Sequence, residues 1–587
     1  MFGEDVTSLL HGSAGLLSAY AVVQGGLLAG LIRGQAGVRR LMMSPLVAAP
    51  LTIMVGAGMA AAAGFASSLG VTAGGVVQLC AGVGCSAALG YAVGRTCTRR
   101  SSLAVTYERG AIVTDGSVAT AIAGRTGGAG GRVCVHHALG ITLAGLPVAA
   151  EDEAKHFKLI GTTGTGKSTA IREMLSAALA RGDRAVIADP DGGYLRHFYD
   201  ATRGDMILNP FDSRSAKWDL FGEVTNDYDV DQLARSLIPD HEGPDRSWRG
   251  YARTFLSAVT AQAHGAGSRE VGELYRLLVV AGTSELKTLV AGTPAQPFLE
   301  EHNGRMFDSI RSVTSSAVSA LEYVSRQRST TLSVRDWVRG VSAPPGIPTS
   351  MGNRGGVLFM PYRAGQIPAL RSIISAWMRL AIFEAMNREE GEQRLWFVVD
   401  ELDALGQIDG LKDALARLRK FGGRCVLGFQ SVAQVSATYG FGEAATITEN
   451  CGNTLILRCS GSEHGGTSQF ASRLIGEREV TRVTRSRSRR LTELFASTTQ
   501  TEHTGVEAAV MGSEIEQLPD LSGYLKLASS PGWQRVRLRA PVPQLRAEPP
   551  PRTARILTFR RASTPERRAR SAAAEQRLAA RDDFEME

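Results

Sequence analysis

Residues 161–169 have the composition and spacing of a loop that binds the phosphates of a nucleotide. They satisfy the pattern GxxxxGK[ST] in full and lie between an apolar run expected to form a strand and a run expected to form a helix. Glycines let the backbone turn tightly and aim consecutive N–H groups at phosphate oxygens, and the N-terminus of the next helix adds its positive dipole end. The residues expected to contact the nucleotide are Gly161, Thr162, Thr163, Gly164, Thr165, Gly166, Lys167, Ser168 and Thr169.

Within this loop, two side chains have chemistry of their own. We expect Lys167 to reach the β and γ phosphates and to act in catalysis, and the hydroxyl of Ser168 to bind Mg²⁺. The alternative is a glycine-rich loop before a helix that binds no ligand. The strand and helix signals on either side argue against that alternative.

Two acidic residues at the end of a distant apolar run supply a second half to such a site. Residues 395–399 read Leu-Trp-Phe-Val-Val, and Asp400 and Glu401 follow directly. A carboxylate at such a strand end binds Mg²⁺ in P-loop enzymes, so we expect Asp400 on the metal and Glu401 as the base beside the attacking water. An apolar strand followed by Asp-Glu is common by chance. The P-loop elsewhere in the chain favours the functional interpretation.

Arg419 and Gln430 are further candidates, each with an ordinary alternative. Gln430 follows an apolar run at 425–429. Its side chain could sense the γ-phosphate there, or Gln430 could be an ordinary polar residue at a strand end. Arg419 could serve the site of a neighbouring subunit, where an arginine finger raises rates by about 10³ to 10⁵. From the pattern alone, a solvated basic residue at a helix end is the favoured interpretation of Arg419.

The chain of 587 residues is long enough for several domains, and its central part alternates between strand and helix signals. Residues 151–217 and 338–540 predict an α/β domain with a mostly parallel sheet covered on both faces. Residues 218–337 break this rhythm with helix-spaced apolar positions, which predicts an inserted all-α domain between the two halves of the nucleotide site. The alternating residues 140–146 predict a single strand that leads into the α/β domain.

Residues 1–100 predict a membrane anchor of two to three transmembrane helices. Residues 41–94 contain no Asp, Glu, Lys or Arg, a run of 54 residues, and a spanning helix needs about 20. We expect spans near 46–67 and 71–93, with a shorter candidate at 16–32. Arginine clusters flank these segments, which predicts that the nucleotide-binding part lies in the cytoplasm. A buried core rich in alanine and glycine is the alternative.

The remaining features of composition exclude some classes of protein. Seven cysteines include no CxxC pair, so neither a disulfide framework nor a zinc site is indicated, and a reducing compartment is expected. The net charge of +8 permits a nucleic-acid partner, although a general preference for arginine explains it equally well. We expect residues 101–150 to form a membrane-proximal segment and residues 541–587 to form a disordered basic tail with an acidic end.

The chain resembles the coupling proteins of type IV secretion and conjugation, the membrane-anchored ATPases of the TraD/TrwB type. Several of the matching stretches are not general nucleotide-site patterns, which makes the resemblance specific. The stretches are HFKLIGTTGTGKST, AVIADPDGGYLRHF, ILNPFDSRSAKWDLFGEVTNDYD, LRSIISAWM, LWFVVDELDALGQIDGL, LRKFGGRCVLGFQSVAQVSATYG and EIEQLPDLSGYLKL.

This resemblance implies a RecA-like P-loop ATPase core with an inserted all-α domain and a transmembrane anchor in the bacterial inner membrane. It implies ATP and Mg²⁺ as cofactors, and a homo-hexamer whose channel passes single- or double-stranded DNA. It also implies delivery of a relaxase and its DNA, the relaxosome, to a type IV secretion channel. Carried onto this chain, the motifs assign the nucleotide to Lys167 and Ser168, Mg²⁺ and water to Asp400 and Glu401, the arginine finger to Arg419 and phosphate sensing to Gln430.

Two other functions fit parts of the sequence. A chromosome-segregation DNA translocase of the FtsK type would share the motor, but its usual winged-helix tail does not match the Pro- and Arg-rich ending here. A membrane-tethered adaptor would bind nucleotide and recruit secretion substrates without pulling them.

The predicted hairpin departs from the family, because almost no loop separates its two spans and a further apolar segment precedes it.

Overall fold

The computed structural model describes residues 13–33, 41–68, 75–98, 105–115, 140–240, 243–340, 356–389, 394–462, 466–488 and 497–540. The chain divides into two compact units. The first comprises Met1–Arg109 with Arg478–Glu507, and the second comprises Gly110–Glu477 with Ala508–Glu587. The predicted tail at 541–587 and most of the predicted segment at 101–150 lie outside the described residues.

Three helices form the N-terminal part of the first unit, at the positions where apolar spans are predicted. They are α2 (Ser13–Arg33), α4 (Ser44–Ser68) and α5 (Gly75–Thr98). Helices α2 and α5 pack with their backbones in close approach. A Cβ atom on Gly26 would lie 2.5 Å from the carbonyl oxygen of Ala87, and one on Gly90 would lie 2.6 Å from that of Val23. Gly26 and Gly90 therefore allow α2 and α5 to pack this closely.

The predicted transmembrane character of these helices is not supported. Among the described residues, no helix combines the length and the apolarity that a bilayer crossing requires. The prediction rested on the absence of charged residues, which is a weaker criterion than sustained apolarity, because glycine and alanine are uncharged but contribute little apolar surface. The same unit contains a three-stranded sheet in the order β1 (Val105–Gly110), β14 (Glu477–Ser488) and β15 (Ser497–Ala508).

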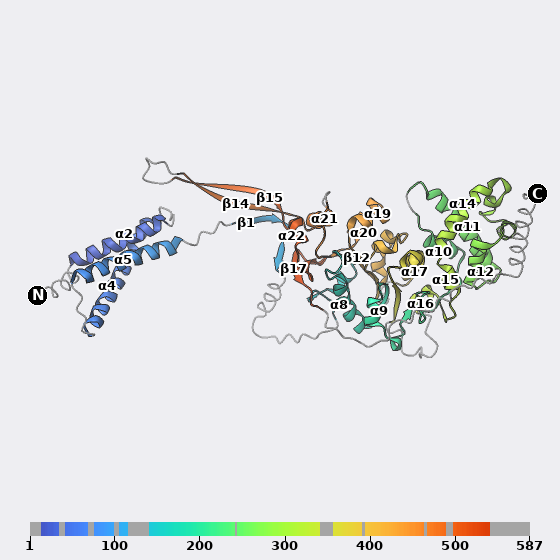
Figure 1. Ribbon diagram of the computed structural model, residues 1–587, viewed down its shortest axis with the longest axis horizontal. Coiled ribbons are helices and arrows are strands. Elements are labelled where there is room, and N and C mark those ends of the chain that lie inside the picture. The colour runs from blue at the N-terminus through green and yellow to red at the C-terminus, as the bar shows by residue number, and fades with distance from the viewer. Residues whose placement is uncertain are drawn as a thin grey trace, which may run out of the picture. The chain divides into compact units, whose positions relative to one another are not determined.

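A ten-stranded mixed sheet forms the centre of the second unit and confirms the predicted α/β class (Figure 1). Strands β13, β5, β12, β11, β6, β10 and β7 are parallel neighbours, whereas β16 pairs antiparallel with β13 and β17. In sheet order the strands are β2 (Val113–Asp115), β17 (Trp533–Arg537), β16 (Ser522–Lys526), β13 (Asn453–Ile456), β5 (Phe157–Ile160), β12 (Gly423–Phe429), β11 (Leu395–Val399), β6 (Arg184–Pro190), β10 (Val357–Tyr362) and β7 (Met206–Ile207).

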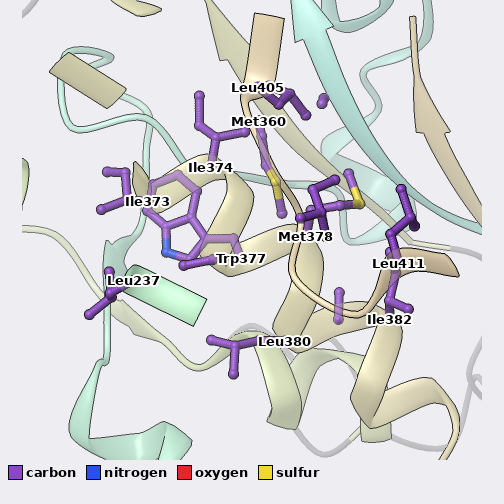
Figure 2. Close-up of a cluster of buried hydrophobic side chains, with 14 of the residues drawn as sticks. Leu237, Met360, Ile373, Ile374, Trp377, Met378, Leu380, Ile382, Leu405 and Leu411 are labelled. Atoms are coloured by element: carbon purple, nitrogen blue, oxygen red, sulfur yellow. The ribbon is translucent and has the colours of Figure 1, made fainter. Parts of the chain in front are cut away.

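Helices cover both faces of this sheet, because successive residues of its central strands point to opposite sides. In β6, Val186 belongs to the core under α17 (Ile367–Ala385), whereas Ile187 belongs to the core under α8 (Lys167–Ala180) and α9 (Gly193–Phe198). We call these the α17 face and the α8 face. In Figure 2, Ile374, Trp377 and Met378 of α17 gather with Met360 of β10 and Leu405.

A group of helices lies between β7 and β10 in the chain, over the α17 face (Figure 1). A short parallel pair, β8 (Lys217–Trp218) with β9 (Thr331–Leu332), closes the base of this group. Its helices are α10 (Asp227–Leu237), α11 (Arg246–Gly265), α12 (Val271–Tyr275), α13 (Thr283–Leu289), α14 (Gly304–Val318), α15 (Leu321–Ser325) and α16 (Val334–Arg339).

The single strand predicted at 140–146 is wrong. The structure has a small hairpin instead, with β3 (Thr142–Leu143) antiparallel to β4 (Leu146–Pro147). Ala144 and Gly145 form its turn with φ of 55° and 76°. Glu173 of α8 stabilises this turn, because its carboxylate accepts hydrogen bonds from the backbone N–H groups of Ala144 and Gly145. Glu173, which is distant in the chain, thus stabilises a turn that the alternation of residues 140–146 does not indicate.

A buried ion pair joins the first and last helices of the inserted group. Asp229 of α10 accepts a hydrogen bond from the guanidinium of Arg335 of α16, and both side chains are almost fully buried. Burial alone would raise the pKa of Asp229. Hydrogen bonds from Arg335, Thr225 and Asn226 outweigh burial and lower this pKa to about 2. Arg335 also lies 3.8 Å from Glu384 of α17, which ties the group to the sheet.

We expect Asp229→Asn to lower the free energy of unfolding at pH 7 by about 3 kcal/mol, because it leaves the Arg335 cation buried without its partner. Since the native pKa lies below the unfolded value of 3.8, the contribution is complete above that value and is lost as the pH falls through about 2. Urea titration at several pH values measures the difference. Asp231→Asn, an exposed change on the same helix, is the control, and equal unfolding free energies for the two variants would contradict the expectation.

Candidate nucleotide site

The P-loop connects the end of β5 to the start of α8, and its backbone requires glycine at three positions. Gly164 and Gly166 have φ of 80° and 120°, a region that other residues rarely adopt. Gly161 has a packing reason as well, since a Cβ atom there would lie 2.8 Å from the Thr165 hydroxyl oxygen and 2.9 Å from Leu457 Cβ. The sequence pattern and the backbone geometry of the loop therefore agree.

Lys167 is the buried cation of this site. Its ammonium group donates hydrogen bonds to the carbonyl oxygens of Gly161, at 2.5 Å, and Thr162, at 3.2 Å. Burial lowers the pKa of Lys167, and the nearby carboxylates of Asp400 and Glu401 oppose that shift. The two acids therefore help to keep the lysine charged beside the loop, where it can meet phosphate oxygens.

Ser168 and Asp400 meet, although 232 positions separate them in the chain. The Ser168 hydroxyl donates to Asp400 Oδ2 at 2.6 Å, and the Tyr194 hydroxyl donates to the same oxygen at 2.8 Å. The second oxygen, Oδ1, is buried and has no hydrogen-bond partner among the described residues. A buried carboxylate oxygen without a partner calls for an explanation, and beside a serine hydroxyl it suits a hard cation such as Mg²⁺.

Glu401 is connected to the P-loop through Gln430. The Gln430 amide donates to Glu401 Oε1 at 2.6 Å, and the Thr163 hydroxyl donates to the Gln430 amide oxygen at 3.2 Å. Burial raises the pKa of Glu401, the charge of Asp400 raises it further, and the Gln430 hydrogen bond acts in the opposite direction. The result is a carboxylate that accepts a proton more readily than an exposed glutamate does.

Asp400 and Glu401 are adjacent in the chain but contact different groups. β11 ends at Val399, and Leu402 is the next residue to join the core of the α17 face, where its N–H donates to the carbonyl oxygen of Gly428. Asp400 contacts Ser168 of α8, whereas Glu401 contacts Gln430 after β12. Metal binding and water activation can thus proceed from adjacent residues without competing for space.

Arg419 lies away from this site within its own chain. It is exposed, and it directly follows α18 (Leu411–Leu418), just before β12 begins at Gly423. The P-loop lies beyond the opposite end of the parallel strands, and seven residues of β12 span about 20 Å. The structure brings Lys167, Ser168 and the two acids together and leaves Arg419 apart.

Three further residues of the site, Asp189, Tyr194 and Tyr362, are not among those predicted from the sequence. Asp189 is the second-last residue of β6, and its buried carboxylate accepts hydrogen bonds from the N–H groups of Tyr194, at 3.0 Å, and Leu195, at 2.7 Å. Burial raises the pKa of Asp189 to about 7 against these hydrogen bonds. Asp189 thereby anchors α9, which presents Tyr194 to Asp400. An acid directly after an apolar strand was a signal for Asp189, but no local pattern pointed to the two tyrosines.

Comparisons with known proteins agree with this geometry. The family model for the type IV secretion-system coupling protein DNA-binding domain matches residues 140–539. The coupling protein TraD of Escherichia coli K12 is 31% identical over 390 residues, which cover 66% of this chain and 53% of TraD. The chain therefore spans about half the length of this curated relative.

Solved structures of the conjugative coupling protein TrwB have a similar fold. Unbound TrwBΔN70 aligns with a TM-score of 0.64 and 29% identity, over 76% of this chain and 96% of the other. TrwB with the ATP analogue ADPNP gives a TM-score of 0.63 with the same identity and coverage. TrwB with ADP and Mg²⁺ gives 0.62 at 30% identity, over 75% and 96%. The chain therefore belongs to the family of type IV secretion-system coupling proteins that includes TraD and TrwB.

Proposed function

We propose that this coupling protein binds ATP with Mg²⁺ and hydrolyses it to move DNA, with its bound relaxase, toward a type IV secretion channel. The observation that carries this proposal is the junction of the P-loop with the two acids, in which Ser168 contacts Asp400 and Thr163 reaches Glu401 through Gln430. The ADPNP complex and the complex with ADP and Mg²⁺, both of TrwB, support the choice of nucleotide and metal.

Each residue has a defined task in the proposed reaction. Lys167 neutralises charge on the β and γ phosphates, and Ser168 and Asp400 hold Mg²⁺. Glu401 accepts a proton from the attacking water, for which its raised pKa suits it. Bound Mg²⁺ supplies positive charge to the phosphoryl oxygens. Because Ser168 must turn its oxygen toward the metal, Tyr194 is the donor that remains on Asp400 Oδ2.

The position of Arg419 supports assembly into a ring. A residue at the far edge of the sheet cannot reach its own chain's phosphates, yet the same edge of one subunit can face the nucleotide site of the next in a head-to-tail ring. We therefore assign Arg419 to the neighbouring site in a homo-hexamer, where its charge would stabilise the transition state. The DNA would pass through the channel of this ring.

Glu401→Gln tests hydrolysis. We expect the purified variant to bind ATP normally but to hydrolyse it about 10³-fold more slowly, with or without DNA, because the water loses its proton acceptor. Plasmid transfer in a mating assay should be lost in parallel. Glu449→Gln, which changes an exposed carboxylate in the same domain, is the control. Unchanged DNA-stimulated hydrolysis in Glu401→Gln would refute the assignment of the base.

A mixing experiment tests the action of Arg419 in a neighbouring site. Arg419→Ala and Glu401→Gln are each expected to be inactive alone. In mixed rings, an Arg419→Ala site that faces a Glu401→Gln neighbour has both groups, so random assembly should restore hydrolysis at about a quarter of the sites. Arg417→Ala, on the same exposed helix end, should behave as wild type. No recovery on mixing would place Arg419 outside the reaction.

We also propose that the helical unit of α2, α4 and α5 attaches the protein to a membrane. Its interior is small, with Val23, Leu27, Leu31 and Ala48 as the buried members. Its outside carries more than half of the exposed large apolar residues in the described chain, an arrangement that suits apolar surroundings. These exposed residues are Leu17, Ile32, Met42, Met43, Leu46, Val47, Ile53, Met54, Phe65, Val83 and Leu89.

Cell fractionation tests this attachment. The full chain should sediment with membranes, resist extraction by high salt, and be released by detergent, because apolar contacts hold it. A chain of residues 101–587 should appear in the supernatant. Lys167→Ala in the full chain controls for effects of nucleotide and should fractionate as wild type. A full chain that salt extracts would show that the helices are not the attachment.

A further inference from the structure

Three buried oxygen atoms without hydrogen-bond partners lie at the carboxyl edge of the sheet. They are Asp400 Oδ1, Asp403 Oδ1 and the hydroxyl of Tyr362, and none has a partner among the described residues. Buried polar atoms are normally paired, and a group of unpaired ones in a site indicates bound water or ligand. The proposed metal accounts for Asp400 Oδ1, and it leaves Asp403 Oδ1 and the Tyr362 hydroxyl unexplained.

Strand order places Tyr362 at the same edge of the sheet as the base. Tyr362 ends β10 and is level with Pro190 of β6, and β6 lies between β10 and β11. Glu401 follows the end of β11 by two residues. Two strand spacings, about 10 Å, separate β10 from β11, a span that two side chains and one water can bridge.

The side chain of Tyr362 is buried at this edge of the sheet. Tyr362 belongs to the core of the α17 face together with Met360, its second neighbour along β10. Tyr362 is only 4% exposed, so bulk solvent does not satisfy its hydroxyl. The hydroxyl therefore lies in the buried region at the edge of the sheet where the two acids follow β11.

Electrostatics keep this hydroxyl protonated. Burial raises the pKa of Tyr362, and the carboxylates of Glu401, Asp400, Asp189 and Asp403 raise it further. A protonated hydroxyl surrounded by carboxylates would be expected to donate to one of them, yet it donates to none. A small molecule held between Tyr362 and the acids would supply the missing acceptor.

The geometry points to Tyr362 as a second holder of the attacking water, which it would fix together with Glu401. In this step the water oxygen forms a bond to the γ-phosphorus, the bond from that phosphorus to the bridging oxygen breaks, and ADP leaves. The proton of the water passes to Glu401, and Tyr362 keeps its own proton throughout. The inference rests on the proposed ATP hydrolysis and adds a residue that touches the reacting water.

Tyr362→Phe tests this inference because it removes one oxygen atom and keeps the ring. If the hydroxyl holds the water, the single-turnover rate of ATP hydrolysis should fall about 10²-fold, whereas the KM for ATP stays unchanged. The affinity for ADP, measured by calorimetry, should match wild type. The melting temperature should stay equal or rise, because the change removes an unpaired buried hydroxyl. Tyr524→Phe, a buried tyrosine of β16 in the same sheet, should keep the wild-type rate.

Three other results would overturn the inference. A rate within twofold of wild type would show that the hydroxyl is not used. A slower rate accompanied by weaker ADP binding or a lower melting temperature would show that Tyr362 only supports the fold. If wild type itself fails to hydrolyse ATP while it binds ADP, the proposed function fails, and this inference fails with it.

Discussion

Parallel pairing of β5, β12, β11 and β6 is the constraint on which the rest of the structure depends. Parallel strands end at the same edge of a sheet, so the P-loop after β5, Gln430 after β12, the two acids after β11 and Asp189 at the end of β6 meet there. The chain contributes these groups from positions as far apart as Thr163 and Gln430, which are separated by 267 positions. The large helical insertion between β7 and β10 does not interrupt this pairing, because its helices pack over one face of the sheet.

The two adjacent acids have different partners. Ser168 and Tyr194 share one oxygen of Asp400, and the other oxygen has no partner among the described residues. Glu401 accepts a hydrogen bond from Gln430, and burial together with the charge of Asp400 raises its pKa. Under the proposed mechanism, this difference would let Asp400 remain a metal ligand while Glu401 exchanges a proton.

Local sequence pattern predicted the parts of the site that chain neighbours determine. The P-loop, the acid pair and Gln430 could be found because each follows an apolar strand, and Asp189 shows the same signal. Tyr194 and Tyr362 could not be found, because their roles depend on which strands are adjacent and in what register. Absence of charge located the N-terminal helices but overestimated their apolarity. The local pattern alone predicts that Arg419 is a solvated residue at a helix end. Its exposure fits both that prediction and a role in the nucleotide site of another subunit.

The placement of Arg419 has a consequence for how such a protein would behave in a cell. Under the proposed arrangement, a single subunit has every group that binds ATP but lacks the arginine that promotes its hydrolysis. Single subunits would therefore keep ATP bound without hydrolysing it, and hydrolysis would begin only where enough subunits assemble. The place where subunits assemble and the number of them present would then control ATP hydrolysis, and no separate inhibitor would be needed.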